Sequence, residues 1–137
     1  MQKIINQLGT AQYNPFRKVV EVRFKNFGEL SAYHETLDLS LYIATTLKVK
    51  KWLLVKNSFS DINPAEFLQV LKVWLYKHRK DLKNNRISLL TKRFEKKQIQ
   101  NLLQFNHLPI NIFCNETVAY QDLEDKSYFL EKSQVNT

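Results

Sequence analysis

Glycine and proline are scarce in this chain of 137 residues. It has two glycines and three prolines, so little of it has the composition of a flexible linker. The two glycines, Gly9 and Gly28, lie far apart, which leaves no glycine-rich loop for a phosphate, and no Gly-x-Ser-x-Gly nucleophile elbow is present. These absences argue against the familiar nucleotide enzymes and serine hydrolases.

Cysteine occurs once, at Cys114. A single thiol forms no internal disulfide and cannot supply a multi-thiolate zinc site within one chain, which fits a reducing compartment. Cys114 ends an apolar segment, so we expect a core or semi-buried thiol rather than a nucleophile.

Long apolar runs are also absent. Residues 1–6 lack the apolar stretch of a signal peptide, and no segment approaches the roughly 20 residues that span a bilayer. We therefore expect a cytoplasmic protein that does not enter a membrane. A chain of this length is expected to form a single domain over residues 1–137, with a core from about 4 to 130 and a frayed tail at 131–137.

Positive charge is abundant but concentrated in one region. The formal net charge is +8, and the window from Lys72 to Gln104 carries all of it, with ten bases against Asp81 and Glu95. The bases of this window are Lys72, Lys77, Arg79, Lys80, Lys83, Arg86, Lys92, Arg93, Lys96 and Lys97. A basic face is expected there.

Hydrophobic periodicity predicts alternating strands and helices. An edge strand within residues 4–12 leads through the Asn14-Pro15 turn to a half-buried strand at 19–24, in which charged Glu21 and Arg23 alternate with apolar residues. A helix from about 29 to 48 and an apolar strand at 52–55 follow. Asn63-Pro64-Ala65-Glu66 marks the start of a helix that is predicted to reach about Leu82.

The second half continues this alternation. A strand at 87–90, a helix at 94–105, a strand at 110–114 and a closing helix from 117 to about 123, with a possible extension through 130, complete the prediction. The order ββαβαβαβα predicts an α/β fold: a single, mostly parallel five-stranded sheet with one antiparallel edge strand, flanked by four helices.

Three patterns resemble the STAS group, the SpoIIAA-like small domains named for anti-sigma-factor antagonists. They are the hairpin ending in Val19-Val20-Glu21-Val22-Arg23-Phe24, the strand Trp52-Leu53-Leu54-Val55 with its loop and helix, and the closing residues Phe113, Ala119 and Leu123. The resemblance covers about residues 13–123. It implies a regulatory or protein-binding module without chemistry of its own.

Some members of that group switch partners when a serine before the second helix is phosphorylated. Here Ser58 and Ser60 lie in the corresponding loop, but the segment 56–63 lacks the aspartate-serine-serine-glycine signature. The two serines are therefore possible phosphorylation sites or simply polar loop residues, and phosphate near a helix N-terminus would be electrostatically acceptable.

Metal and cofactor chemistry is not indicated by the residues. His34, His78 and His107 lie in three separate elements without the close spacing of a metal-binding pair, so we expect no metal and no cofactor. We also expect no enzymatic activity.

Besides binding of a protein partner, the sequence leaves two other binding functions open. A homodimer is possible as well. A polyanion or nucleic acid would contact Lys77, Arg79, Lys80, Lys83, Arg93, Lys96 and Lys97, if these bases converge. A small ligand would occupy a cleft between helices lined by Tyr33, Tyr42 and Tyr76, which are otherwise ordinary packing residues.

Overall fold

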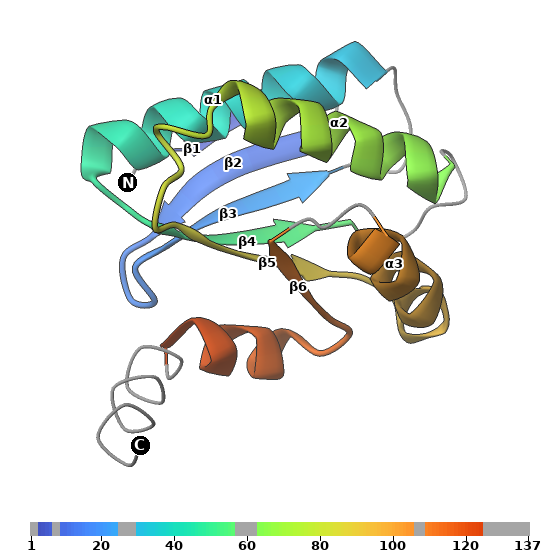
Figure 1. Ribbon diagram of the computed structural model, residues 1–137. Helices are drawn as coiled ribbons and strands as arrows, with labels where there is room; N and C mark the ends of the chain where they lie inside the picture. Colours follow the sequence, from blue (N-terminus) through green and yellow to red (C-terminus); the bar gives the residue numbers. More distant parts are fainter. Residues whose placement is uncertain (1–2, 7–8, 25–29, 57–62, 106–108, 125–137) are drawn as a thin grey trace, which may run out of the picture.

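The computed structural model describes residues 3–6, 9–24, 30–56, 63–105 and 109–124. These residues form one six-stranded sheet with helices on both faces (Figure 1). The strands are β1 (Lys3–Asn6), β2 (Gly9–Asn14), β3 (Val19–Phe24), β4 (Lys51–Val55), β5 (Arg86–Leu90) and β6 (Ile110–Phe113). The helices are α1 (Leu30–Leu47), α2 (Pro64–Lys77), α3 (Arg93–Phe105) and a last helical segment at 116–124.

The strands lie side by side in sequence order. β1, β2 and β3 pair antiparallel, and β3, β4, β5 and β6 pair parallel. The predicted α/β class, with a mostly parallel sheet, an antiparallel edge and four helices, is confirmed.

The segment 4–12 differs from the prediction in detail, because it contributes two strands instead of one. Asn6 pairs with Gly9, so the chain reverses within this segment. The sequence does not mark the reversal with the Asn-Gly or Asp-Gly pair that is typical of a two-residue hairpin. The sheet consequently has one strand more than predicted.

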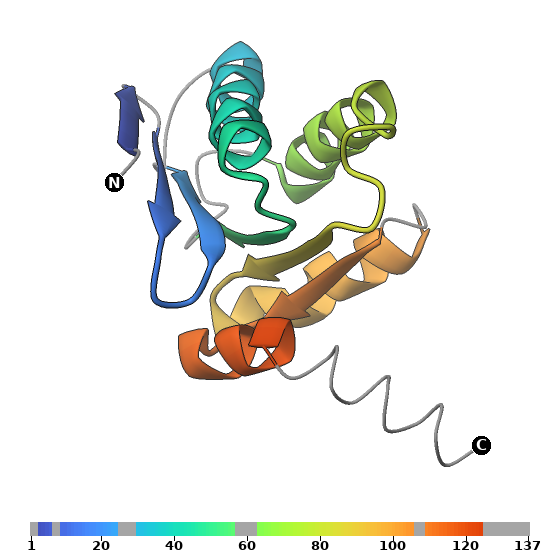
Figure 2. The same cartoon turned by 90° about the vertical axis from the view of Figure 1, so that its left-hand side faces the viewer.

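Three helices cover one face of the sheet, which we call the first face. Each parallel strand is joined to the next by a crossover helix, and right-handed crossovers that advance in one direction place their helices on the same side. Figure 2 shows α1 and α2 standing together on this side of the strands. The strand residues of this core are Ala11, Val20, Val22, Phe24, Trp52, Leu54, Ile87, Leu89, Ile110 and Ile112.

The opposite, second face is covered by the 116–124 helix, which lies below the sheet in Figure 1. Its residues Ala119, Tyr120 and Leu123 form a separate apolar cluster with Val19, Leu53, Val55 and Leu90 of the sheet. Leu53 and Val55 therefore face one layer while Trp52 and Leu54 face the other, which explains the continuous apolar run of β4. The closing helix predicted from residue 117 is confirmed, and its possible extension to 130 lies outside the described residues, as does the tail at 131–137.

Helix α2 begins as predicted but ends earlier. The Asn63 side-chain oxygen accepts a hydrogen bond from Ala65 N at 2.8 Å, and Pro64 occupies the first helical turn. The helix ends at Lys77, with His78 at its C-cap, and hydrogen-bonded turns follow as far as Asn84, whose φ is 66°. Leu82 lies in one of these turns, and its side chain is buried there. Its spacing from the apolar residues of α2 is that of a helix, which is why the sequence predicted a longer helix.

In the described ranges, no helix combines the length and the apolar character that crossing a bilayer requires.

Candidate interaction surface

Helix α2 exposes apolar side chains on the side that faces away from the sheet. It buries Phe67, Leu68, Val70, Leu71 and Trp74 against the first face. Val73 and Tyr76 lie on the other side and are 46% and 69% exposed. Large apolar side chains that remain this open next to each other are candidates for contact with another molecule.

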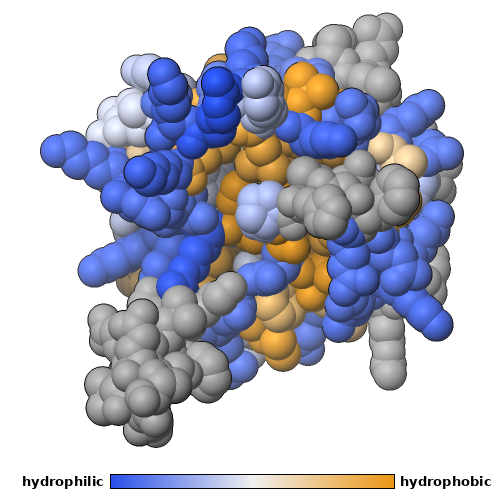
Figure 3. Space-filling view, viewed as in Figure 1, coloured by the Kyte–Doolittle hydropathy of each residue, from blue (hydrophilic) through white to orange (hydrophobic). Residues whose placement is uncertain are grey.

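These side chains border a mostly apolar hollow of about 480 Å³. Its lining residues are Gln69, Lys72, Val73, Leu75, Tyr76 and Pro109, and we call this surface the α2 exterior. Pro109 immediately precedes β6, so the hollow lies between the second half of α2 and the start of the last strand. Figure 3 shows apolar side chains gathered in the middle of this face of the molecule, within a hydrophilic border.

Two bases lie at the apolar part of the α2 exterior, because Lys72 lines the hollow and Arg79 contacts Tyr76; three more bases follow at the end of the helix and in the turns after it. Lys72, Lys77, Arg79, Lys80 and Lys83 are all exposed, and no ion pair joins any of them to a described residue. The Arg79 guanidinium stacks 4.4 Å from the Tyr76 ring centre and donates a hydrogen bond to Tyr76 O at 2.8 Å. This contact fixes a cation at the edge of the apolar surface.

The predicted bases do not converge on one face. Lys77, Arg79, Lys80 and Lys83 follow the end of α2, near the amino ends of the parallel strands. Arg93, Lys96 and Lys97 belong to the start of α3, near the carboxyl ends. Each crossover helix begins at the carboxyl end of one strand and finishes at the amino end of the next. The end of α2 and the start of α3 therefore lie at opposite ends of the strands, which separates the two groups of bases by about 17 Å. The bases of the window that carries the net charge of +8 are therefore divided between two separate surfaces.

The predicted tyrosine cleft is not present. Tyr33 is buried in an edge-to-face cluster with Phe24 and Phe67, whereas Tyr42 and Tyr76 are exposed on different helices. The spacing that placed all three on helices could not show which of them faced the sheet.

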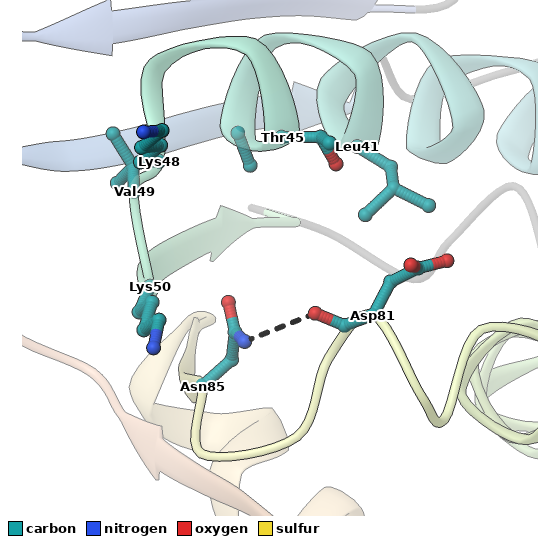
Figure 4. A pocket seen from close by; sticks show the side chains of 8 residues that line it. Leu41, Thr45, Lys48, Val49, Lys50, Asp81 and Asn85 are labelled. Atoms are coloured by element: carbon teal, nitrogen blue, oxygen red, sulfur yellow. Dashed lines mark hydrogen bonds between the residues drawn. The ribbon is translucent and has the colours of Figure 1, made fainter.

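A hollow of about 240 Å³ does lie beside the end of α1, but none of the three tyrosines lines it (Figure 4). Leu41, Ala44, Thr45, Lys48, Val49, Lys50, Asp81 and Asn85 line it. The Asn85 side chain donates to Asp81 O and Lys83 O, and its oxygen accepts from Trp52 Nε1 at 2.9 Å. The polar groups of Asn85 thus close the turn over Trp52, whose ring packs edge to face against that of Trp74 with the ring centres 5.5 Å apart.

The carboxyl ends of the strands contain a buried lysine that sequence reasoning missed. Lys56 is 0% exposed, and its Nζ lies 5.5 Å from the Tyr33 ring centre. Its position two residues after Leu54 continues the first-face register of β4, which is the signal that could have identified it. The loop with Ser58 and Ser60 lies outside the described residues, so phosphorylation there stays a prediction.

Glu21 is the second buried charge, on the second face beneath the 116–124 helix. Its carboxylate accepts hydrogen bonds from Asn14 Nδ2 at 2.8 Å and from the Tyr120 hydroxyl, and Arg23 Nη2 lies 3.6 Å away. Burial, and next the hydrogen bond to Glu21, raise the pKa of the Tyr120 hydroxyl. The alternation of β3 predicted a solvent-facing Glu21, because the helix that covers it is distant in sequence.

Two exposed ion pairs border this network. Arg17 Nη1 lies 2.9 Å from Glu124 Oε1, and Arg23 Nη2 lies 2.9 Å from Glu116 Oε1. They join β3 and the turn before it to the two ends of the helix. The polar cluster is therefore explained by its structural role, which is to hold the 116–124 helix against the sheet.

The histidines and the cysteine are dispersed. His78 Nε2 lies 3.3 Å from Asp38 Oδ1, His34 lies on α1, and His107 is outside the described residues. Within the ranges that the structure describes, no three side chains of the metal-binding types form a cluster. Cys114 is exposed, not buried as expected, because β6 ends at Phe113 and the thiol follows the strand.

Comparison of the chain with protein-family models, with curated proteins and with solved structures found no match. The candidate surface therefore rests on the geometry of the α2 exterior alone.

Proposed function

We propose that this protein is a non-enzymatic interaction module that binds an acidic, amphipathic segment of a protein partner on the α2 exterior. The observation that supports the proposal is the placement of Val73 and Tyr76 side by side, open to solvent, next to Lys72 and Arg79, two exposed bases without ion-pair partners in the described chain.

Apolar and charged groups contribute differently to such a contact. Burial of Val73 and Tyr76 would supply affinity, since apolar area removed from water contributes ~25 cal/mol per Å² and tyrosine is frequent among residues that dominate interfaces. The bases would speed association with an acidic partner and would discriminate against a basic one. Only two large apolar side chains are exposed here, which fits a weak or transient complex better than an obligate one, whose interfaces are larger and more apolar.

The proposal agrees with what the resemblance to the STAS group implies, although membership of that group stays a prediction, as does a cytoplasmic location. Binding is favoured over catalysis on the α2 exterior, because its lining residues are apolar or basic apart from the neutral amide of Gln69, and no nucleophile with an adjacent base lines it.

The test compares partner capture by three forms of the protein. The double variant Val73→Ser and Tyr76→Ser removes the apolar surface, while Tyr42→Ser removes a tyrosine of similar exposure, 64%, from α1. We expect a discrete partner to bind the wild type and Tyr42→Ser stoichiometrically in calorimetry with purified proteins. The double variant should bind at least about tenfold more weakly. Equal binding by all three forms would refute the assignment of the surface. Steady turnover of a substrate would refute the proposal that the protein has no enzymatic activity.

A second candidate function, polyanion or nucleic-acid binding, is favoured by the bases that follow α2. Lys77, Arg79, Lys80 and Lys83 lie within one short segment near the amino ends of the strands. Phosphate binding by these side chains would weaken steeply as salt concentration rises, through counterion release.

Heparin chromatography at low salt separates this candidate from the first. Changing Lys77, Arg79 and Lys80 to glutamate should abolish retention, while Lys96→Glu with Lys97→Glu, which reverses two charges at the other basic surface, should reduce it less. Retention of the triple variant would exclude polyanion binding at this site.

A further inference from the structure

Strand β6 leaves one side of its backbone without a partner among the described residues. It is the last strand in the sheet order and pairs only with β5. Phe113 O accepts from Thr91 N at 2.9 Å, so the backbone of Phe113 faces β5. Because the backbone groups of successive residues in a strand point to opposite sides, Ile110 and Ile112 direct their N–H and C=O groups outward.

A groove of about 420 Å³ runs along this outer side. α3 contributes Gln100, Leu103 and Gln104 on the first-face side, and Asp122 of the 116–124 helix contributes the second-face side. Asn111 points toward that helix, where its Nδ2 lies 3.5 Å from Asp122 Oδ2. A strand placed in this groove would meet Gln100 and Gln104, with the mostly buried Leu103 between them, on one side and Asn111, Phe113 and Asp122 on the other.

A basic hollow adjoins the groove at the carboxyl end of β6. Lys96, Lys97, Gln100, Cys114 and Asn115 line about 600 Å³ there, and Gln100 belongs to both spaces. Neither lysine forms an ion pair with a residue that the structure describes. Two uncompensated cations therefore stand at one end of the open strand edge.

We propose that the β6 edge accepts an extended segment of a partner protein as a seventh, antiparallel strand, with acidic residues preceding alternating apolar and polar residues. In an antiparallel pair the amino end of the added strand lies beside the carboxyl end of β6, which brings its acids to Lys96 and Lys97. Main-chain hydrogen bonds to Ile110 and Ile112 provide affinity, and the two different sides of the groove select alternating side chains.

A second copy of this chain fits the edge less well. The residues just before β6 would then lie beside the lysines, and Pro109 carries no charge. Two chains of formal charge +8 would also repel each other. The lysines favour an acidic occupant instead.

The test uses the synthetic peptide acetyl-DEVTVTV-amide and the complete protein labelled at its one cysteine, Cys114, with an environment-sensitive fluorophore. We expect saturable binding, together with slowed amide hydrogen exchange at Ile110 and Ile112 when the unlabelled protein binds the peptide. A peptide with alternate backbone N-methyl groups, which cannot pair with the edge, should bind at least about tenfold more weakly. The same is expected for acetyl-KKVTVTV-amide, because it reverses the charge that meets the lysines.

The matched protein variants are Lys96→Glu with Lys97→Glu and, as a control, Lys77→Glu with Lys80→Glu. The first pair should weaken binding about fivefold or more, and the control pair should change it by less than about twofold. Undetectable binding of the acidic peptide, or undiminished binding of its N-methylated form, would overturn the proposal.

A concentration-dependent dimer of the unliganded protein that protects the Ile112 amide would also overturn it, because a second copy would then occupy the edge. The experiment is independent of the α2 exterior: Val73→Ser with Tyr76→Ser should leave peptide binding at β6 unchanged.

Discussion

Replacing Leu123 by alanine tests whether the 116–124 helix is an integral part of the fold. Leu123 is 0% exposed and packs into the second-face cluster with Leu53, Val55 and Leu90. A helical segment this short is marginal by itself, so its stability must come from packing. Truncation of a fully buried leucine destabilises a protein by ~2–5 kcal/mol through lost burial and the cavity left behind.

Urea unfolding followed by tryptophan fluorescence provides the measurement. Trp52 and Trp74 lie in the first-face core, 5.5 Å apart, so their signal reports unfolding of the whole domain and not only loss of the helix. We expect the free energy of unfolding to fall by ~2–4 kcal/mol for Leu123→Ala. Val118→Ala, on the same helix but 45% exposed, should change it by less than about 0.5 kcal/mol.

A loss below about 0.5 kcal/mol for Leu123→Ala, or equal losses for the two variants, would refute the assignment of the helix to the second-face core. A detached helix would produce that result, since the tryptophans would not sense its removal.

Two further predictions concern buried hydrogen bonds. The pKa of Tyr120 in the folded chain is raised above its unfolded value of about 10. At a pH above about 10 the folded state therefore keeps a proton that the unfolded state releases. The free energy of unfolding should fall as pH rises through and above about 10 for this reason. Tyr120→Phe should make this decline shallower in denaturation series at increasing pH, and identical slopes would contradict the buried contact with Glu21. Asn85→Ala leaves the Trp52 indole N–H without its acceptor and should cost ~1–3 kcal/mol in thermal unfolding, while Asn84→Gly, at a positive φ, should not destabilise. Unchanged stability of Asn85→Ala would show that this bond contributes nothing.

The local signals of the sequence were sufficient for most elements. The alternation of Val20, Val22 and Phe24 predicted β3, and the Asn63-Pro64 pair predicted the start of α2. Helix ends were less certain, because Leu82 has helical spacing yet is buried from a turn. The β1–β2 reversal was missed because its pairing depends on backbone hydrogen bonds that few side-chain types specify.

The candidate surfaces required coordinates. Exposure of Val73 and Tyr76 depends on which side of α2 meets the sheet, and the free side of β6 depends on the strand order. Neither the exposed side of α2 nor the position of β6 at the edge of the sheet can be read from a short window of sequence.

By itself, the sequence determined the alternation of strands and helices, because apolar periodicity follows from burial of one side of each element. Only the tertiary structure decided how those elements combine: it divided the basic window between the two ends of the sheet, and it buried Glu21 beneath a helix about a hundred positions away along the chain. The physical reason is that crossover connections and long-range packing set the neighbours of each side chain, whereas local propensity sets only its backbone.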